Sequence, residues 1–203
     1  MNTRMICFLL AMCAVWSAGA TNARADQYQD GLAAWIKGDF ANGVRLLTPL
    51  ADRGDPAAQT IVGGAYAGGW GVEKDCGKGL ELLSEAAQAN YPQAQYAMGR
   101  LSATGTCLAK SYENAFMWYK KGAALHDPDA EFAVGYFYNV GRVVPMDIVE
   151  AYRWYTMCVS DGKNAPSYSR GNVEAAKNNL NQMHSMMSED EIARANALIS
   201  ASR

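Results

Sequence analysis

The chain has 203 residues, half of them hydrophobic and 19% charged, with a net charge of −2 at neutral pH. This composition supports a packed core of one medium-sized domain and excludes an intrinsically disordered chain. Because there is no basic run and no arginine-rich stretch, nucleic acid and an anionic membrane surface are poor candidates as partners.

The first 25 residues have the pattern of a secretory signal peptide. Arg4 makes a positive start, residues 6–16 form an apolar run too short to span a bilayer, and Ala23-Arg24-Ala25 fits a small–x–small cleavage site. Ala18-Gly19-Ala20 is a second possible cleavage site, and an uncleaved anchor is the alternative. We expect a periplasmic or secreted protein that begins at Asp26, is not inserted in a membrane after cleavage, and carries a net charge of −4.

Residues 26–57 are expected to form an N-terminal helical hairpin. Its helices are predicted over residues 27–37 and 40–53, with Gly38-Asp39 as turn and cap between them. Pro49 is expected to kink the second helix because proline lacks an amide hydrogen.

Three helix pairs follow, over residues 58–93, 94–129 and 130–163, because a whole pattern recurs every 36 residues. In each pair a proline opens the first helix, a glycine ends it, and Asp or Ser caps the second helix. These positions are Pro56, Pro92 and Pro128; Gly69, Gly105 and Gly141; and Asp75, Ser111 and Asp147. A fixed period of this length is typical of a solenoid, so the predicted fold is an all-α array of helix-turn-helix repeats.

Glycine also recurs inside the first helices, at Gly63, Gly99 and Gly135. An interior helical glycine costs about 1 kcal/mol relative to alanine, so we expect close helix crossings at these positions. The second helices carry the large core side chains, among them Trp118 and Trp154. Asp147 and Glu150 are expected to form a capping box.

Residues 164–203 depart from the period and are predicted to form a C-terminal helical cap. A helix is expected over residues 172–186, and a capping box of Ser188 and Glu191 opens a last helix to about residue 201. The cap would cover the apolar end of the array.

These repeats resemble the Sel1-like repeat family, whose helix-turn-helix units are related to tetratricopeptide repeats. The unit from Ala58 to Ala87 keeps Val62-Gly63, Tyr66, Gly69-Trp70-Gly71-Val72, Asp75, Lys78 and Ala86-Ala87, but has Gly79 and Leu82 in place of alanine and tryptophan. The later units keep Gly99, Gly105, Ala115 and Trp118, then Gly135, Tyr138, Gly141, Asp147, Ala151 and Trp154, but lack the second loop glycine. The resemblance implies an α-solenoid that recognises a protein or ligand, and it carries over no catalytic residue.

Three cysteines remain after cleavage, and an exported protein meets oxidising conditions. Stacked repeats bring corresponding loops together, so a disulfide is predicted between Cys76 and Cys107. Cys158 is predicted to be a buried free thiol. With no close cysteine pair and only His126 and His184, we expect neither a metal site nor a cofactor.

Two groups of residues are candidates for catalysis. Ser160-Asp161-Gly162-Lys163 fits the S-x-x-K spacing of penicillin-recognising serine enzymes, but the partner motifs of that class are absent and Asp-Gly is ordinary turn chemistry. The acidic run Glu189-Asp190-Glu191 opens a predicted helix, where carboxylates favour the helix dipole. A non-enzymatic protein is therefore expected.

The first helices of tetratricopeptide-like solenoids line a concave surface, so the resemblance points to a binding face. The residues predicted to form it are Tyr96, Arg100, Phe132, Tyr136 and Asn139. The alternative is that these aromatic residues pack between repeats. The resulting hypothesis is a monomeric exported scaffold that binds a protein or peptide; a penicillin-interacting hydrolase using Ser160 and a secreted effector are the alternatives.

Overall fold

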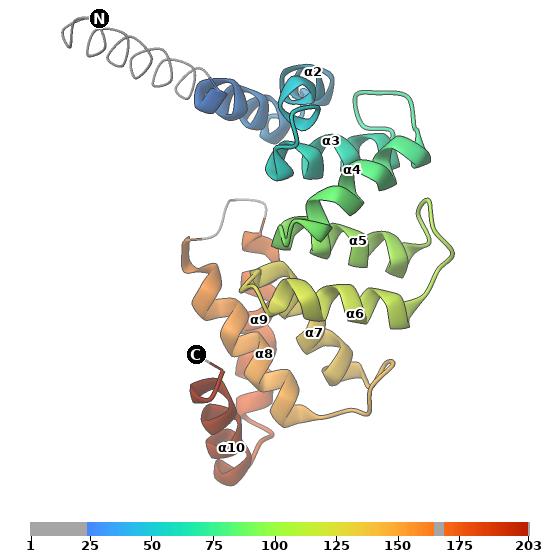
Figure 1. The fold of residues 1–203 in the computed structure, drawn as a ribbon. Helices are drawn as coiled ribbons and strands as arrows, with labels where there is room; N and C mark the ends of the chain where they lie inside the picture. Colours follow the sequence, from blue (N-terminus) through green and yellow to red (C-terminus); the bar gives the residue numbers. More distant parts are fainter. Residues whose placement is uncertain (1–23, 165–168, 203) are drawn as a thin grey trace, which may run out of the picture.

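The computed structural model describes residues 24–164 and 169–202, which form helices and connecting loops without strands (Figure 1). Most of the predicted signal peptide, residues 1–23, lies outside the described residues. A helix over residues 24–36 comes first, and the following elements are α2 (Phe40–Ala51), α3 (Pro56–Gly68), α4 (Cys76–Gln88), α5 (Pro92–Thr104), α6 (Tyr112–Ala123), α7 (Pro128–Val140), α8 (Ile148–Asp161), the 3-10 turn η1 (Gly162–Asn164), α9 (Arg170–His184) and α10 (Glu189–Ser200).

The predicted all-α solenoid is confirmed. Helix α3 packs against α4, α5 against α6, and α7 against α8, and the pairs stack in one row. Helix α2 precedes them against α3 and contains Pro49 within its length. None of the helices in the described ranges is both long and apolar enough to cross a membrane.

The recurring prolines and glycines have the predicted roles. Each proline occupies the start of its helix, and each closing glycine takes a left-handed conformation, with φ of 75°, 77° and 65° in turn. The predicted caps of the second helices also form, through the side chains of Asp75, Ser111 and Asp147. Local backbone chemistry therefore defines the ends of the repeat helices.

The interior glycines lie at close helix crossings, as predicted. A Cβ atom on Gly99 would lie 2.5 Å from Cε1 of Tyr119, and one on Gly135 would lie 2.9 Å from Cδ1 of Tyr155. At Gly63 the same atom would lie 2.9 Å from Cγ of Leu83. The second helix of each pair therefore packs directly onto the glycine of the first.

The two predicted core tryptophans differ in burial. Trp154 is 4% exposed and belongs to the buried cluster around α6 to α8. Trp118 is only partly buried, and the ammonium of Lys121 lies 4.4 Å from its ring centre. Trp154 is therefore a core residue, whereas Trp118 covers the edge of its repeat.

The predicted capping box of Asp147 and Glu150 is wrong. Asp147 does cap α8, since its carboxylate accepts from the amides of Val149 and Glu150. The Glu150 carboxylate instead accepts from the guanidinium of Arg153 at 3.1 Å and from the indole of Trp154 at 3.0 Å. These donors lie three and four residues further along the helix, where a side chain can reach them from the same face.

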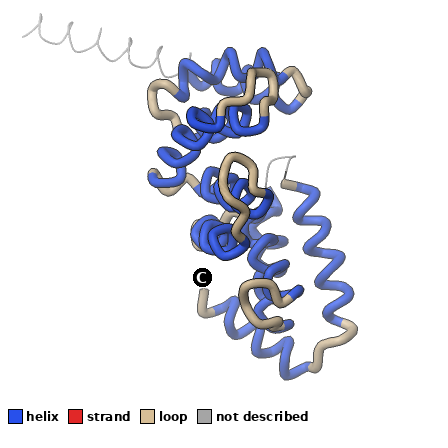
Figure 2. The backbone as a smooth tube through the Cα atoms, turned by 90° about the vertical axis from the view of Figure 1, so that its right-hand side faces the viewer, coloured by secondary structure: helices blue, strands red, loops and turns tan. Residues whose placement is uncertain are grey.

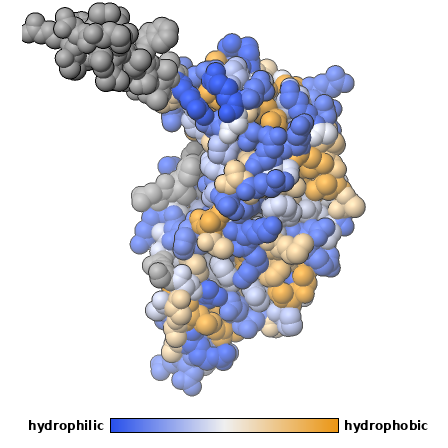
Figure 3. Space-filling model, viewed as in Figure 1, coloured by the Kyte–Doolittle hydropathy of each residue, from blue (hydrophilic) through white to orange (hydrophobic). Residues whose placement is uncertain are grey.

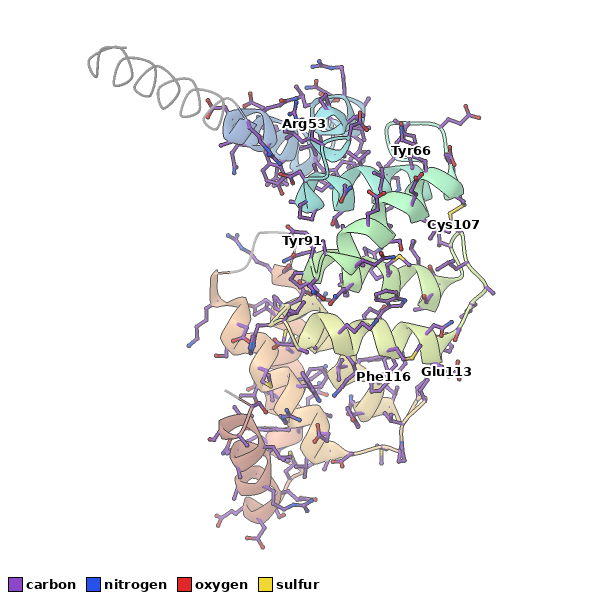
Figure 4. The ribbon with its side chains drawn as sticks, viewed as in Figure 1. Arg53, Tyr66, Tyr91, Cys107, Glu113 and Phe116 are labelled. Carbon is purple, nitrogen blue, oxygen red and sulfur yellow. A yellow bond between two sulfur atoms is a disulfide. The ribbon has the colours of Figure 1, made fainter. Side chains whose placement is uncertain are left out.

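The predicted disulfide between Cys76 and Cys107 is confirmed, with Cα atoms 5.2 Å apart (Figure 4). It joins the start of α4 to the loop between α5 and α6, so it links consecutive repeats. Cys158 is a buried free thiol, as expected. The chain lacks a glycine at positions 107 and 143, yet both residues keep a left-handed backbone, with φ of 63° and 70°.

The C-terminal residues form two helices that cover one side and the end of the array. Helix α9 contacts both α7 and α8, and α10 contacts α8. Figure 2 shows α9 running along the side of the molecule and α10 returning across its end. The predicted capping box of Ser188 and Glu191 is present at the start of α10.

Candidate functional site

A cavity of about 540 Å³ lies between the helix over residues 24–36 and the first helices of the following pairs. Its volume lies in the range of pockets that hold small ligands or side chains of a partner. The residues that line it are Tyr28, Leu32, Trp35, Ile36, Gly38, Phe40, Ala57, Thr60, Ile61, Gly64, Trp70, Tyr91, Gln93, Tyr96, Ala97, Arg100 and Asp129. Figure 4 places Tyr91 at the start of α5, on the side of the array from which the first helix extends.

The repeat builds one wall of this cavity from equivalent positions. Residues 57, 93 and 129 are spaced by 36 and all line it, as do the pairs Thr60–Tyr96 and Gly64–Arg100. Since equivalent residues of stacked helices lie one above another, the same helix face recurs from repeat to repeat. This wall is thus a continuous surface formed by α3, α5 and the start of α7.

Aromatic residues of the N-terminal hairpin and of the loop between α3 and α4 also line the cavity. The ring of Trp35 lies 4.8 Å from that of Phe40 and 6.0 Å from that of Trp70, measured between centroids. Trp70 is 44% exposed and Ile36 is 53% exposed, so apolar area remains open at the mouth.

Trp70 is held in place by the loop that carries it. Gly71 has a φ of 72°, and a Cβ atom there would lie 2.4 Å from the backbone nitrogen of Ala41. Only glycine fits so close to the start of α2. The loop between α3 and α4 is therefore anchored against the hairpin, which positions the indole beside Trp35.

Arg100 and Asp129 give the cavity its charged groups. The Arg100 side chain is exposed, and within the described parts of the chain its guanidinium makes no hydrogen bond or ion pair. Asp129 is buried, and its carboxylate accepts from Ser169 and Asn172, each at 2.7 Å. The arginine is therefore available to a ligand, whereas the aspartate already has partners.

Tyr96 connects the cavity to the core. Its ring lies 5.6 Å from that of Tyr119, and its hydroxyl accepts from the Asn172 amide at 3.5 Å. Burial raises the pKa of Tyr96, the nearby Asp129 carboxylate adds to this increase, and Arg100 opposes it. The phenol stays neutral at physiological pH and offers an apolar face to the cavity.

Two of the five residues predicted for the binding face line the cavity, and the other three lie elsewhere, on α7. Tyr96 and Arg100 line the cavity. Phe132 packs against Tyr155, with ring centroids 5.5 Å apart, in the cluster completed by residues of α9. Tyr136 is 41% exposed beside Phe137, outside the cavity lining.

Asn139 is exposed on α7 near the buried hydroxyl of Tyr155. Burial raises the pKa of Tyr155 to about 12, although Asn179 and Asn139 favour its ionised form. Phe132, Tyr136 and Asn139 thus lie along α7, where α9 packs alongside. The binding proposed below is assigned to the cavity, whose lining does not include these three residues.

Sequence reasoning missed the aromatic residues of the hairpin and of the first loop. Trp35, Phe40 and Trp70 lie outside α3, α5 and α7, the regular first helices on which the predicted binding face lies. One signal was available, however: Tyr28 stands 36 residues before Gly64 and 72 before Arg100. Extending the period backwards would have placed Tyr28 on the same face.

The S-x-x-K tetrapeptide forms the end of α8 and the start of η1. Its lysine, Lys163, is exposed. A Cβ atom on Gly162 would lie 2.4 Å from Cγ2 of Val173, so this glycine permits α9 to pack against α8. The close packing of α9 therefore explains why Gly162 occupies the third position of this tetrapeptide.

Cys158 does not have the surroundings of a reactive thiol. It is fully buried, and burial raises its pKa well above the ordinary value. The carboxylates of Glu131 and Asp129 raise it further. Because the thiolate is the nucleophilic form, this cysteine has a packing role.

A further apolar surface lies on the loops at the other edge of the array. Figure 3 shows apolar patches along the right-hand edge, where the α5–α6 and α7–α8 loops lie. In the α7–α8 loop, Val143 is 42% exposed and Met146 is 75% exposed. Neither residue lines the cavity.

The stacked helix pairs define a helical-repeat protein with a cavity lined by its first helices. Residues 56–91, 92–127 and 128–157 each match the Sel1 repeat, and the chain therefore belongs to the Sel1 repeat family. Proteins of this family are in general scaffolds for protein interactions.

Two solved structures illustrate the likeness. A protective antigen of uropathogenic Escherichia coli with the SLR fold is 23% identical at a TM-score of 0.64, over 79% of this chain and 32% of the antigen. A Sel1 repeat protein from Oxalobacter formigenes is 28% identical at a TM-score of 0.52, over 64% of this chain and 95% of that protein. This chain thus corresponds to about a third of the antigen's length. Among curated proteins none matches the sequence.

Proposed function

We propose that the protein is a non-enzymatic, exported scaffold that binds a peptide segment of a partner protein in the aromatic cavity. The carrying observation is the combination of an open aromatic wall with Arg100, a cation without a partner in the described parts of the chain. Aromatic residues and arginine are the side chains that most often dominate protein interfaces.

The dimensions of the cavity favour a few side chains of a peptide over a large folded surface. A volume of about 540 Å³ can enclose several side chains. The apolar rings would bury apolar side chains of the peptide, and the guanidinium would donate to a carboxylate or a backbone carbonyl of the peptide. In this proposal the protein binds its partner as a monomer.

Export is supported by the N-terminal pattern and by the disulfide. The disulfide between Cys76 and Cys107 is compatible with an oxidising compartment. The mature chain would begin at Asp26 in the periplasm or outside the cell.

Capture from an envelope extract tests the binding proposal when paired with matched variants. Wild-type mature protein, Arg100→Ala and Tyr136→Ala would be immobilised, and the bound proteins compared. Tyr136 is the matched control because it occupies the equivalent position one repeat later, is exposed, and lies outside the cavity. We expect Arg100→Ala to weaken binding of the specific partner about five- to thirtyfold, the effect of losing 1–2 kcal/mol, while Tyr136→Ala binds like wild type. Equal capture by all three proteins would reject the cavity as the binding site.

A further inference from the structure

His126, Glu131 and Asp161 come together from three separate segments. They belong to the turn between α6 and α7, to α7 itself, and to the last residue of α8. The Nδ1 atom of His126 lies 2.9 Å from Oδ2 of Asp161 and 3.9 Å from Oε1 of Glu131. One nitrogen and two carboxylate oxygens therefore converge, all within 4.8 Å of one another.

The backbone conformation at His126 brings its imidazole close to the two carboxylates. His126 has a left-handed backbone with φ of 60°, a conformation also adopted by Gly54 and Asn90 at the equivalent turns. This turn directs the imidazole toward the end of α8. Glu131 is fully buried, whereas the imidazole is 53% exposed, so the cluster has an inner and an outer side.

Only one of the three repeats carries this set of donors. The position of Glu131 is a glutamine in the two earlier repeats, where Gln59 bonds Glu85 at 2.7 Å and Gln95 bonds the Ala87 carbonyl at 3.1 Å. The positions equivalent to His126, Glu131 and Asp161 are Asn90, Gln95 and Leu125, and one repeat earlier Gly54, Gln59 and Ala89. The general fold of the repeat therefore does not require a histidine and two carboxylates here.

We propose that His126, Glu131 and Asp161 bind a divalent transition-metal ion of the Zn²⁺ type. Zn²⁺ binds imidazole nitrogen and carboxylate oxygen at about 2.0–2.2 Å, which separates tetrahedral ligand atoms by about 3.4 Å. The two distances from the His126 nitrogen lie on either side of this value, so small side-chain rotations suffice. The fourth position would hold water on the exposed side of the imidazole.

The charge of the surroundings favours a cation at this point. Asp127 and Asp129 are buried next to the cluster, at the start of α7. Together with Glu131 and Asp161 they make four carboxylates, and all four raise the pKa of the nearby Cys158 thiol. A divalent ion would reduce the repulsion among these acids. It would also tie the α6–α7 turn to α7 and α8, and thereby stabilise the third repeat.

The proposal is tested by Zn²⁺ titration of untagged, chelator-treated protein by calorimetry. The variant His126→Asn removes the imidazole but tolerates the left-handed backbone, and Asp161→Asn removes a carboxylate without changing size. The matched control is His184→Ala, because His184 is the other histidine and is exposed near the end of α9. Circular dichroism of each variant checks that helicity is retained.

We expect one Zn²⁺ per chain for wild type and His184→Ala, and an affinity at least about tenfold weaker for His126→Asn and Asp161→Asn. Co²⁺ bound to wild type should give a spectrum without thiolate charge-transfer bands, which separates this site from Cys158. Absence of stoichiometric binding to wild type, equal binding by His126→Asn, or a thiolate band would each overturn the proposal. If both site variants lose helicity, the wild-type titration and the Co²⁺ spectrum decide alone.

Discussion

Removing the disulfide should lower the stability of the array by several kilocalories per mole. The variant Cys76→Ser/Cys107→Ser opens a link between residues that are 31 apart in sequence. The loop-entropy relation gives about 3.7 kcal/mol at 25 °C for a closed loop of this length. Cys107 has a left-handed backbone with φ of 63°, and serine would have to adopt the same conformation. The backbone strain is therefore the same in both proteins and does not add to the difference in stability.

The loss would be measured by urea unfolding of the oxidised wild type, the double variant and the reduced wild type. Helicity and tryptophan fluorescence should be followed together, because coincident curves are needed for a two-state free energy. Reduced wild type and the double variant should agree, since both lack the same link. A loss below about 1 kcal/mol in both would refute the reasoning, because the link would then not restrict the unfolded chain.

The other predictions concern the core, the crossings and maturation. Trp154→Ala should lower the free energy of unfolding by about 3–5 kcal/mol and Trp118→Ala by less, because only Trp154 is fully packed; equal losses in urea melts would contradict this difference. Gly99→Ala should destabilise, because its Cβ would lie 2.5 Å from Tyr119 and overpacking costs about 1–3 kcal/mol, whereas Gly64→Ala meets no atom within 4 Å and should stabilise by up to about 1 kcal/mol. Thermal melts showing the reverse order would disprove the steric role of Gly99. N-terminal sequencing of exported protein should give Asp26, and full-length protein confined to the cytoplasm would count against export.

The helical array was predictable because its signals are local and repeated. A proline at a helix start, a left-handed glycine at its end and an Asp or Ser cap each act within one turn, and the period aligns them. The Glu150 error has the opposite origin. The Glu150 carboxylate can reach either the backbone amide at the helix start or the side-chain donors of Arg153 and Trp154, and it accepts from the latter. The residue spacing alone does not predict which of these hydrogen bonds forms.

The candidate site was predictable only where it follows the period. Tyr96 and Arg100 were found because they share one face of a regular first helix. Trp35 and Trp70 were missed because a hairpin and a loop bring them together, and Phe132 is covered because α9 departs from the repeat and packs along α7. The cluster of His126, Glu131 and Asp161 likewise depends on where α8 ends relative to a distant turn.

Site-specific photo-crosslinking tests most directly whether the aromatic cavity holds the partner. A photoreactive residue would replace Ile36 at the mouth of the cavity or Met146 on the α7–α8 loop, both of which are more than half exposed. The two proteins would be irradiated in the same envelope extract and the adducts compared. We expect a discrete adduct from position 36, reduced by Arg100→Ala in the same chain, and none from position 146. An adduct from position 146 alone would contradict the account and move the binding surface to the loops.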